Sequence, residues 1–212
     1  MGNSKIKTLS DRMKDYELVS DYRLTKKTPV IVRIDGKAFH TYTKGLDKPF
    51  DSTLSEAMNY ICRKLIETVQ GCKFAYTQSD EISLLLTDWD KPTTDCYFDY
   101  RVQKMVSVLA SAATMYFNQF IMTNVLYWEI CSSGQSKELF DKWEPKAGCA
   151  MFDARAYNIP KEDVCNYFIW RQEDASRNSI QSLGRSKFSF KKMLNKKNNE
   201  VQDMLFNECS IN

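Results

Sequence analysis

Two acidic sites carry the strongest chemical signal in this sequence of 212 residues. Asp35-Gly36 follows Thr28–Ile34, an apolar and β-branched run that predicts a buried strand, and Asp80-Glu81 lies between two further strand-like runs. Carboxylates that meet at one end of neighbouring strands offer Mg²⁺ the oxygen ligands it prefers, and two such ions clamp the oxygens of a phosphoryl transfer. Gly36 lets the backbone approach a metal or a phosphate closely. Two ordinary surface turns are the alternative, because Asp and Gly are common there.

Basic residues near these acids suit a triphosphate. Lys37 follows Gly36 directly, and Lys44 and Lys48 lie in the next loop. Arg101 and Lys104 are three residues apart at the start of a predicted helix, so their side chains point the same way. Cations around a metal site neutralise the charge that develops on phosphates. For Arg101 and Lys104, a solvated helix face is the alternative.

The sequence lacks the motifs of several other common catalytic and nucleotide-binding sites. The sequence has no GxxxxGK[ST] loop, GxGxxG turn, GxSxG elbow or HExxH helix, which excludes the corresponding nucleotide-binding, hydrolase and zinc-protease readings. Its seven cysteines are scattered without a CxxC pair, and His40 is the only histidine. We therefore expect neither a zinc site nor a disulfide framework. We also expect the protein to reside in a reducing compartment. His40 is a candidate base or stacking partner, or a structural residue.

The composition predicts a globular protein of the cytoplasm. Hydrophobic residues make up 43% of the chain and charged residues 27%, as in ordinary globular domains. The N-terminal segment has no apolar signal core. The longest apolar candidate, Val106–Ala113, is shorter than the roughly 18 residues of a membrane helix, so we expect no membrane association.

A one-sided basic block lies near the C-terminus. The net charge is only +3, but residues 175–199 contain seven bases and no acid. Such a block suits a polyanion, because phosphates neutralised by the protein release their counterions. A solvated basic helix face is the alternative. The bases are Arg177, Arg185, Lys187, Lys191, Lys192, Lys196 and Lys197.

The order of predicted elements indicates an α+β fold. Strand, helix, strand, strand, helix, strand is the ferredoxin-like pattern, which is also the core of the polymerase palm, and we expect its helices on one face of an antiparallel sheet. We expect a palm-like core over residues 1–160 and a helical basic region over residues 161–212 in the same compact unit. The strands are Thr28–Ile34, Cys72–Thr77, Ile82–Leu86, Val125–Ile130 and Cys149–Tyr157, and the helices are Ser52–Val69 with Ser52 as N-cap, Tyr97–Phe120, Lys161–Leu183 and Asn199–Asn207.

One face of the helix Lys161–Leu183 carries polar side chains. Arg171, Asp174 and Asn178 are spaced at i, i+3 and i+7, which places them on that face. They would contact the acidic sites or RNA. Alternatively, Arg171 and Asp174 only pair with each other.

Five segments in order resemble the tRNA(His) guanylyltransferase superfamily, over about residues 8–205. No single segment is decisive, but the ordered set is specific. The segments are Arg33–His40, Lys48-Pro49 with Asp51, Tyr76–Glu81, Phe152–Arg155, and Trp170–Gln172 with Asp174 and Asn178.

The resemblance implies an enzyme that adds nucleotides to the 5′ end of tRNA and grows the chain from 3′ to 5′. ATP first activates the 5′-monophosphate, and the 3′-hydroxyl of an incoming nucleoside triphosphate, such as GTP, then displaces AMP. Two Mg²⁺ ions, ATP and GTP, tRNA and a homotetramer belong to this picture.

The resemblance also implies roles for individual residues. Asp35 and Asp80 match the metal-binding carboxylates, the Gly36 carbonyl a further ligand, and Glu81 the rest of the acidic cluster. Lys48 and Ser79 match positions near the reacting phosphates. The segment that wraps the nucleotide in the family corresponds to Lys37, Ala38, Phe39 and His40. The cations of a second triphosphate site correspond to Arg101 and Lys104. The residues that would contact RNA are Asn178, Arg185, Lys187, Lys191 and Lys192.

One departure discriminates within the superfamily. Eukaryotic tRNA(His) guanylyltransferases carry His-Ile-Asn-Asn-Leu-Tyr-Asn where this chain has Ser176–Ser182, and only Asn178 matches in kind. The chain therefore resembles the guanylyltransferase-like branch, which repairs truncated tRNA 5′ ends by copying the opposite strand.

Three alternatives stay open at this point. One is a tRNA(His) guanylyltransferase that adds a single G, and another is a non-catalytic RNA-binding protein on a palm fold. The third, a palm enzyme that makes signalling nucleotides, lacks its Gly-Gly-Asp/Glu-Glu/Asp-Phe turn, because Gln78–Glu81 stands there instead.

Overall fold

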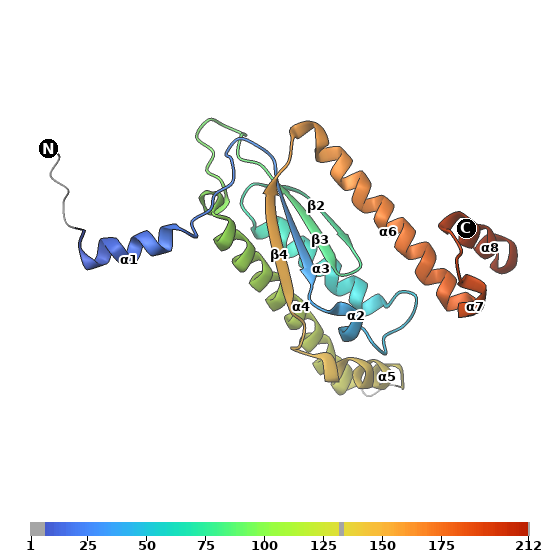
Figure 1. Ribbon diagram of the computed structural model, residues 1–212. Coiled ribbons are helices and arrows are strands. Elements are labelled where there is room, and N and C mark those ends of the chain that lie inside the picture. Colours follow the sequence, from blue (N-terminus) through green and yellow to red (C-terminus); the bar gives the residue numbers. More distant parts are fainter. Residues whose placement is uncertain (1–6, 132–133, 212) are drawn as a thin grey trace.

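A computed structural model describes residues 7–131 and 134–211, which form an α+β fold on a four-stranded antiparallel sheet. The strand order is β2-β3-β1-β4, as in a ferredoxin-like palm, so the predicted fold class is confirmed (Figure 1). The strands are β1 (Val30–Gly36), β2 (Cys72–Gln78), β3 (Glu81–Leu86) and β4 (Phe152–Asn158).

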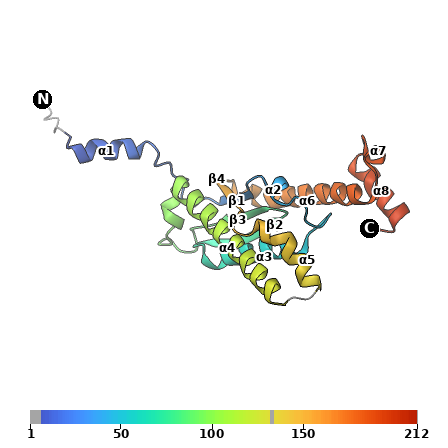
Figure 2. The ribbon, with the colours of Figure 1, turned by 90° about the horizontal axis from the view of Figure 1, so that it is seen from below.

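The two faces of the sheet differ in polarity because side chains alternate along each strand. Val32 and Ile34 of β1 and Leu84 of β3 are fully buried on the apolar face. Helices α3 (Ser52–Thr68) and α4 (Val102–Cys131) cover that face. Arg33 and Asp35 point to the other face. Helix α6 (Val164–Lys187) lies on that side of the sheet, away from α3 and α4 (Figure 2).

Helix α4 differs most from the sequence prediction. The segment Tyr97–Tyr100 is a separate 3₁₀ turn, in which Phe98 and Asp99 have left-handed backbone angles. The predicted strand Val125–Ile130 is wrong, because α4 continues to Cys131. Its β-branched and aromatic residues extend the buried stripe of the helix at helical spacing, so packing overrides their strand propensity. The buried stripe comprises Met105, Leu109, Ala113, Phe117, Ile121, Val125 and Trp128.

By length and composition alone, α4 is also able to span a membrane, and it is the one such helix among residues 7–131 and 134–211. The expectation that no segment has these properties is therefore wrong. A helix at the core of a globular domain has the same length and composition. The buried stripe of α4 lies against the sheet and α3, which is the packing of such a core helix.

The first and last helices, α1 and α8, lie away from the sheet (Figure 1). Helix α1 (Leu9–Leu18) begins at a capping box formed by Thr8 and Asp11, and none of its residues is buried. At the other end, α7 (Phe190–Met193) and α8 (Asn198–Cys209) pack against the last turns of α6. Gly184 makes this packing possible, because a Cβ there would lie 2.6 Å from Val201 Cγ1.

The remaining helices are short. Helix α2 (Phe39–Tyr42) follows β1, and α5 (Gly134–Trp143) with the 3₁₀ turn Glu144–Lys146 precedes β4. Another 3₁₀ turn, Lys161–Asp163, leads into α6. The N-cap of α3 is Asp51 rather than the predicted Ser52, because the Asp51 carboxylate accepts a hydrogen bond from the Leu54 backbone N–H at 3.0 Å.

Candidate active site

Four carboxylates lie at one end of the sheet. The antiparallel register places Asp35 directly opposite Glu81 of β3 and Asp153 of β4, so all three side chains share the polar face. Asp80 lies in the hairpin turn, and its carbonyl accepts a hydrogen bond from the Gly36 backbone N–H at 3.1 Å. The structure therefore brings the two acidic sites of the sequence together.

Asp35 holds an unfavourable negative charge. Its carboxyl is partly buried, and this desolvation raises its pKa above the usual value. The neighbouring carboxylates Asp80 and Asp153 raise the pKa further, while Arg33 and Arg155 oppose the shift. A carboxylate in this setting gains from a bound cation.

The donor set fits Mg²⁺ bound together with a nucleotide. Within the described part of the chain, no three His, Cys, Asp or Glu side chains form a group that could hold a metal on its own. Mg²⁺ commonly takes only one or two carboxylates and completes its shell with waters and substrate phosphates. Asp35 and Asp80, with the Gly36 carbonyl, are a set of that kind.

Gly36 is required by packing. A Cβ on Gly36 would lie 2.3 Å from the Phe39 ring, which occupies the space that a side chain would take. Phe39 is buried among Tyr42, Phe117 and Phe152, with ring centroids 4.9–5.6 Å apart. The Phe39 side chain is therefore part of the core and does not face a nucleotide.

The rest of the turn after β1 is exposed. The Lys37 backbone N–H donates to the Met151 carbonyl at 2.9 Å, and Ala38 takes a left-handed conformation with φ of 54°. His40 is exposed, and its Nε2 lies 3.0 Å from the Thr41 hydroxyl. This turn begins directly beside the acidic residues.

Ser79 forms the tip of the hairpin turn. Its φ of 50° is left-handed, and its hydroxyl donates to Asp80 Oδ1 at 2.9 Å. Ser79 is exposed, so the hydroxyl can turn toward an incoming phosphate. The structure thus places Ser79 beside the acidic cluster.

Two lysines that the sequence interpretation missed anchor the loop that carries Lys44 and Lys48. Lys146 Nζ donates to the carbonyls of Tyr42 at 2.7 Å and Lys44 at 2.9 Å, and the Tyr42 hydroxyl donates to the Lys146 carbonyl at 3.1 Å. Lys142 Nζ lies 2.7 Å from Asp47 Oδ1. No local sequence pattern links these segments, because the partners are about 100 residues apart.

Lys146→Met should loosen the loop over residues 42–51. Methionine keeps the apolar part of the side chain but removes both hydrogen bonds, at a cost of roughly 1.4 kcal/mol or more, so local opening should become about tenfold more frequent. Amide hydrogen exchange measured by mass spectrometry checks this. Lys73→Met is the control, because Lys73 is an exposed lysine that pairs with Asp90. Equal exchange in the two variants would contradict the anchoring role.

Glu81 differs from the other three acids because it is buried, and two arginines lie against it. Its side chain is 10% exposed, and its two oxygens lie 2.9 Å from Arg171 Nε and 3.3 Å from Arg33 Nε. Both contacts are ion pairs. Desolvation raises the pKa of Glu81, and the two guanidinium groups oppose that shift. Glu81 thus lies in the cluster as an ion-pair partner.

Arg171 connects the acidic cluster to α6. Beyond Glu81, it pairs with Asp174 at 2.7 Å, and Asp174 also accepts from Arg177 at 3.0 Å and from Asn178 at 3.4 Å. The polar face predicted on this helix therefore contacts the acidic end of the sheet through Arg171. Asn178 lies further along and is exposed.

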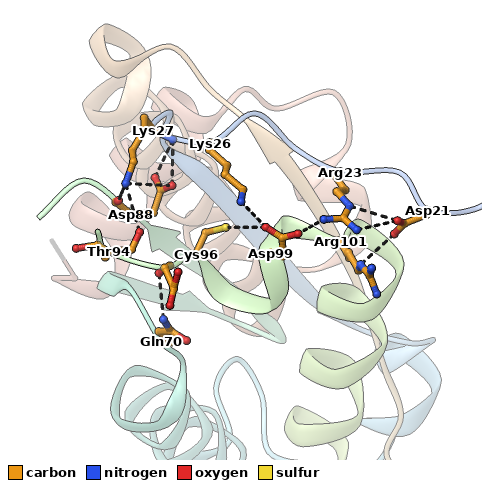
Figure 3. Close-up of polar contacts among 11 residues, drawn as sticks. Asp21, Arg23, Lys26, Lys27, Gln70, Asp88, Thr94, Cys96, Asp99 and Arg101 are labelled. Carbon is orange, nitrogen blue, oxygen red and sulfur yellow. Dashed lines mark hydrogen bonds and ion pairs between the residues drawn. The ribbon is translucent and has the colours of Figure 1, made fainter. Parts of the chain in front are cut away.

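Arg101 and Lys104 lie away from the acidic cluster. Arg101 forms an isolated β-bridge with Arg23 and an ion pair with Asp21 at 3.2 Å, in a network that continues through Arg23 to Asp99 (Figure 3). This network lies near the start of β1, whereas Asp35 lies near its end, roughly 17 Å along the strand. The expectation that these two cations ring the acidic site is not met within one chain.

The basic residues predicted to contact RNA lie at the end of α6 and in α7. Arg185, Lys187 and Lys191 are exposed and have no ion-pair partner in residues 7–131 and 134–211. Lys192 pairs with Glu208. The structure thus separates the acidic site from the basic block.

Comparison with known proteins identifies the family of this fold and site. The family model described as tRNAHis guanylyltransferase matches residues 10–160. The tRNA(His) guanylyltransferase of Debaryomyces hansenii is 30% identical over 206 residues, which cover 89% of this chain and 69% of that protein. The chain spans 59% to 69% of the length of three curated relatives that it matches.

Two solved structures are more similar. A bacterial tRNA(His) guanylyltransferase-like protein in complex with ATP is 42% identical, with a TM-score of 0.83 over 97% of this chain and 82% of the other. A second, in complex with GTP, is 40% identical, with a TM-score of 0.77 over 97% and 79% of the two chains. Five motifs, a palm-like sheet with clustered carboxylates, and these matches agree: the chain belongs to the tRNAHis guanylyltransferase family.

Proposed function

We propose that this chain is a nucleotidyltransferase that extends the 5′ end of truncated tRNA in the 3′-to-5′ direction, using Mg²⁺, ATP and other nucleoside triphosphates. The observation that carries the proposal is the meeting of Asp35 and Asp80 at the end of a palm-like sheet. Family membership and the similarity to proteins in complex with ATP and GTP support it.

The residues around the acidic cluster divide the work of holding a triphosphate. Asp35, Asp80 and the Gly36 carbonyl hold Mg²⁺, which when bound neutralises the charge of the phosphates. The exposed backbone of the turn Lys37–His40 and the Ser79 hydroxyl contact the phosphates. Lys48 supplies a positive charge from the loop that Lys142 and Lys146 anchor.

The reaction proceeds in two displacements at phosphorus. A 5′-phosphate oxygen of the RNA attacks the α-phosphorus of ATP, and pyrophosphate leaves. The 3′-hydroxyl of the incoming nucleotide then attacks the activated 5′-phosphorus, AMP leaves, and the hydroxyl proton passes to solvent. The residues of the site bring the reactants together and neutralise the developing charge, which is the main task in phosphoryl transfer.

Templated repair is favoured over addition of a single G to tRNA(His) by one segment. Ser176–Ser182 replaces the His-Ile-Asn-Asn-Leu-Tyr-Asn sequence of the eukaryotic enzymes, and its Asn178 donates to Asp174 within the same helix. A non-catalytic RNA-binding role leaves the acidic cluster without a purpose, because carboxylates repel phosphates unless a cation lies between them.

An extension assay tests the proposal. The protein is incubated with 5′-truncated tRNA, ATP and labelled GTP, with either C or A in the template position. We expect Mg²⁺-dependent extension opposite C and little opposite A. Preferred addition of G opposite A73 of intact tRNA(His) would favour the single-G enzyme, and RNA binding without extension would favour the non-catalytic role.

We propose in addition that the protein acts in the cytoplasm as a homotetramer. The exposed apolar side chains of α1, among them Leu9, Met13 and Tyr16, support self-association, because the described part of the chain leaves them uncovered. Sedimentation equilibrium measures the mass of the assembly, and a monomer at micromolar concentration would contradict the proposal.

A further inference from the structure

An exposed aromatic side chain lies within the basic block. Phe190, the first residue of α7, is 82% exposed. Arg185 and Lys187 come five and three residues before it, in the last turn of α6, and Lys191 follows it directly in α7. We call these four residues the Phe190 surface. It combines an uncovered ring with three cations that lack an ion-pair partner in the described part of the chain.

The neighbouring lysines differ from these three cations because they have ion-pair partners. Lys192 pairs with Glu208, and its Nζ lies 4.7 Å from the centroid of the Phe188 ring. Lys196 pairs with Glu200 at 2.8 Å. These contacts tie α7 and the following loop to α6 and α8, so the Phe190 surface is held in place while its own charges stay available.

A ring among free cations matches one class of partner well. A single-stranded nucleic acid offers phosphates for the cations and the face of an unstacked base for the ring. A duplex offers the phosphates but keeps its base faces covered by stacking. An apolar protein partner would leave the three positive charges unpaired, which is costly at a buried interface.

The Phe190 surface is a second contact place, separate from the acidic cluster. Arg171 touches Glu81, and Lys187 follows Arg171 by 16 positions in α6, which corresponds to about 24 Å along the helix axis. Close packing of Gly184 against Val201 and Met193 fixes the direction in which α7 leaves α6.

We propose that the Phe190 surface binds unpaired nucleotides of the RNA substrate. Phe190 stacks on one base, and Arg185, Lys187 and Lys191 contact the phosphates on either side of it. The inference rests on the proposed function in taking RNA as the substrate, and it adds that part of this RNA is single-stranded where it meets the C-terminal helices.

Fluorescence anisotropy with two labelled RNAs of equal length tests this, one single-stranded and one a blunt-ended duplex without a loop. Phe190→Ala should weaken binding of the single strand about 5- to 100-fold, the usual contribution of one stacked base, and leave binding of the duplex nearly unchanged. Phe190→Trp should keep the affinity. Phe206→Ala is the matched control, because Phe206 is a 59% exposed phenylalanine on α8, which carries Glu200, Asp203 and Glu208.

The outcomes separate this inference from the proposed function. Unchanged affinity of Phe190→Ala for the single strand, or an equal loss for both RNAs, would overturn it even if the protein extends tRNA. Selective loss would support it even if no extension is detected. Circular dichroism melting of each variant excludes unfolding as the cause of a loss. Reversal of Lys187 and Lys191 to Glu should weaken both RNAs and lower the slope of affinity against salt.

Discussion

Replacing Asp35 with asparagine should abolish nucleotide addition and at the same time make the metal-free protein more stable. Loss of a carboxylate that holds Mg²⁺ should lower the rate by about 10³-fold or more, because the phosphate charge then lacks its main counter-charge. Removal of a desolvated charge that Asp80 and Asp153 repel should stabilise the fold. A gain of about 1 kcal/mol corresponds to a rise in Tm of about 2–4 °C.

The pH dependence follows from the raised pKa of Asp35. A carboxyl whose pKa is higher in the folded than in the unfolded protein favours the fold below its unfolded value, and this contribution is lost as the pH rises through the folded pKa. The Tm gain of Asp35→Asn should therefore be present at neutral pH and vanish in acid. Mg²⁺ should raise the Tm of the wild type more than that of the variant.

Asp203→Asn is the control for these measurements, because Asp203 is an exposed acid on α8, far from the cluster. It should leave both the rate and the Tm unchanged. Full activity in Asp35→Asn would remove Asp35 from the proposed mechanism, and a lower Tm at neutral pH would show that the carboxylate is not under repulsion.

Replacing Arg171 with methionine should cost about 3 kcal/mol of the free energy of unfolding. The Arg171 side chain is 6% exposed and pairs with Glu81 and Asp174. Removing one partner of a buried ion pair leaves the other charge without compensation, and this typically costs about 3–5 kcal/mol. We take the lower end because Arg33 still faces Glu81. Urea denaturation followed by circular dichroism measures the change.

The double variant Arg171→Met with Glu81→Gln tests the cause of that loss. With no charge on residue 81, at least half of the lost stability should return, because the penalty of a buried unpaired carboxylate is gone. Arg177→Met is the matched control, since Arg177 pairs with Asp174 at an exposed site and should change stability by less than about 0.5 kcal/mol. Additive losses in the double variant would disprove the pairing as the source.

The local parts of the fold were predictable from the sequence, and the failures have physical causes. The strand before Asp35 follows from a β-branched run, and the two strands beside Asp80 follow from short apolar runs on either side of a turn. The helix–strand error at Val125–Ile130 arose because the same apolar residues fit a strand by propensity and a core helix by spacing. Only packing against the sheet decides between them.

The long-range parts of the site were not predictable from local patterns. Proximity of Arg101 to the acids was inferred from its position at the start of α4, but the helix begins at the opposite end of the sheet. The pairing of Arg171 with Glu81 and the anchoring by Lys146 join segments about 90–100 residues apart. The pattern of a single sequence carries no signal for such contacts.

The length of helix α6 sets the distance between the acidic cluster and the Phe190 surface. Its Arg171 is fastened to the acidic end of the sheet, and the Phe190 surface follows its last turn. Because an uninterrupted helix is stiff, the number of residues in α6 sets which nucleotide of a bound RNA meets Phe190 when the 5′ end lies at Asp35. One more turn in α6 would place the Phe190 surface about 5.4 Å further from the acidic cluster, and a nucleotide further from the 5′ end would then meet Phe190.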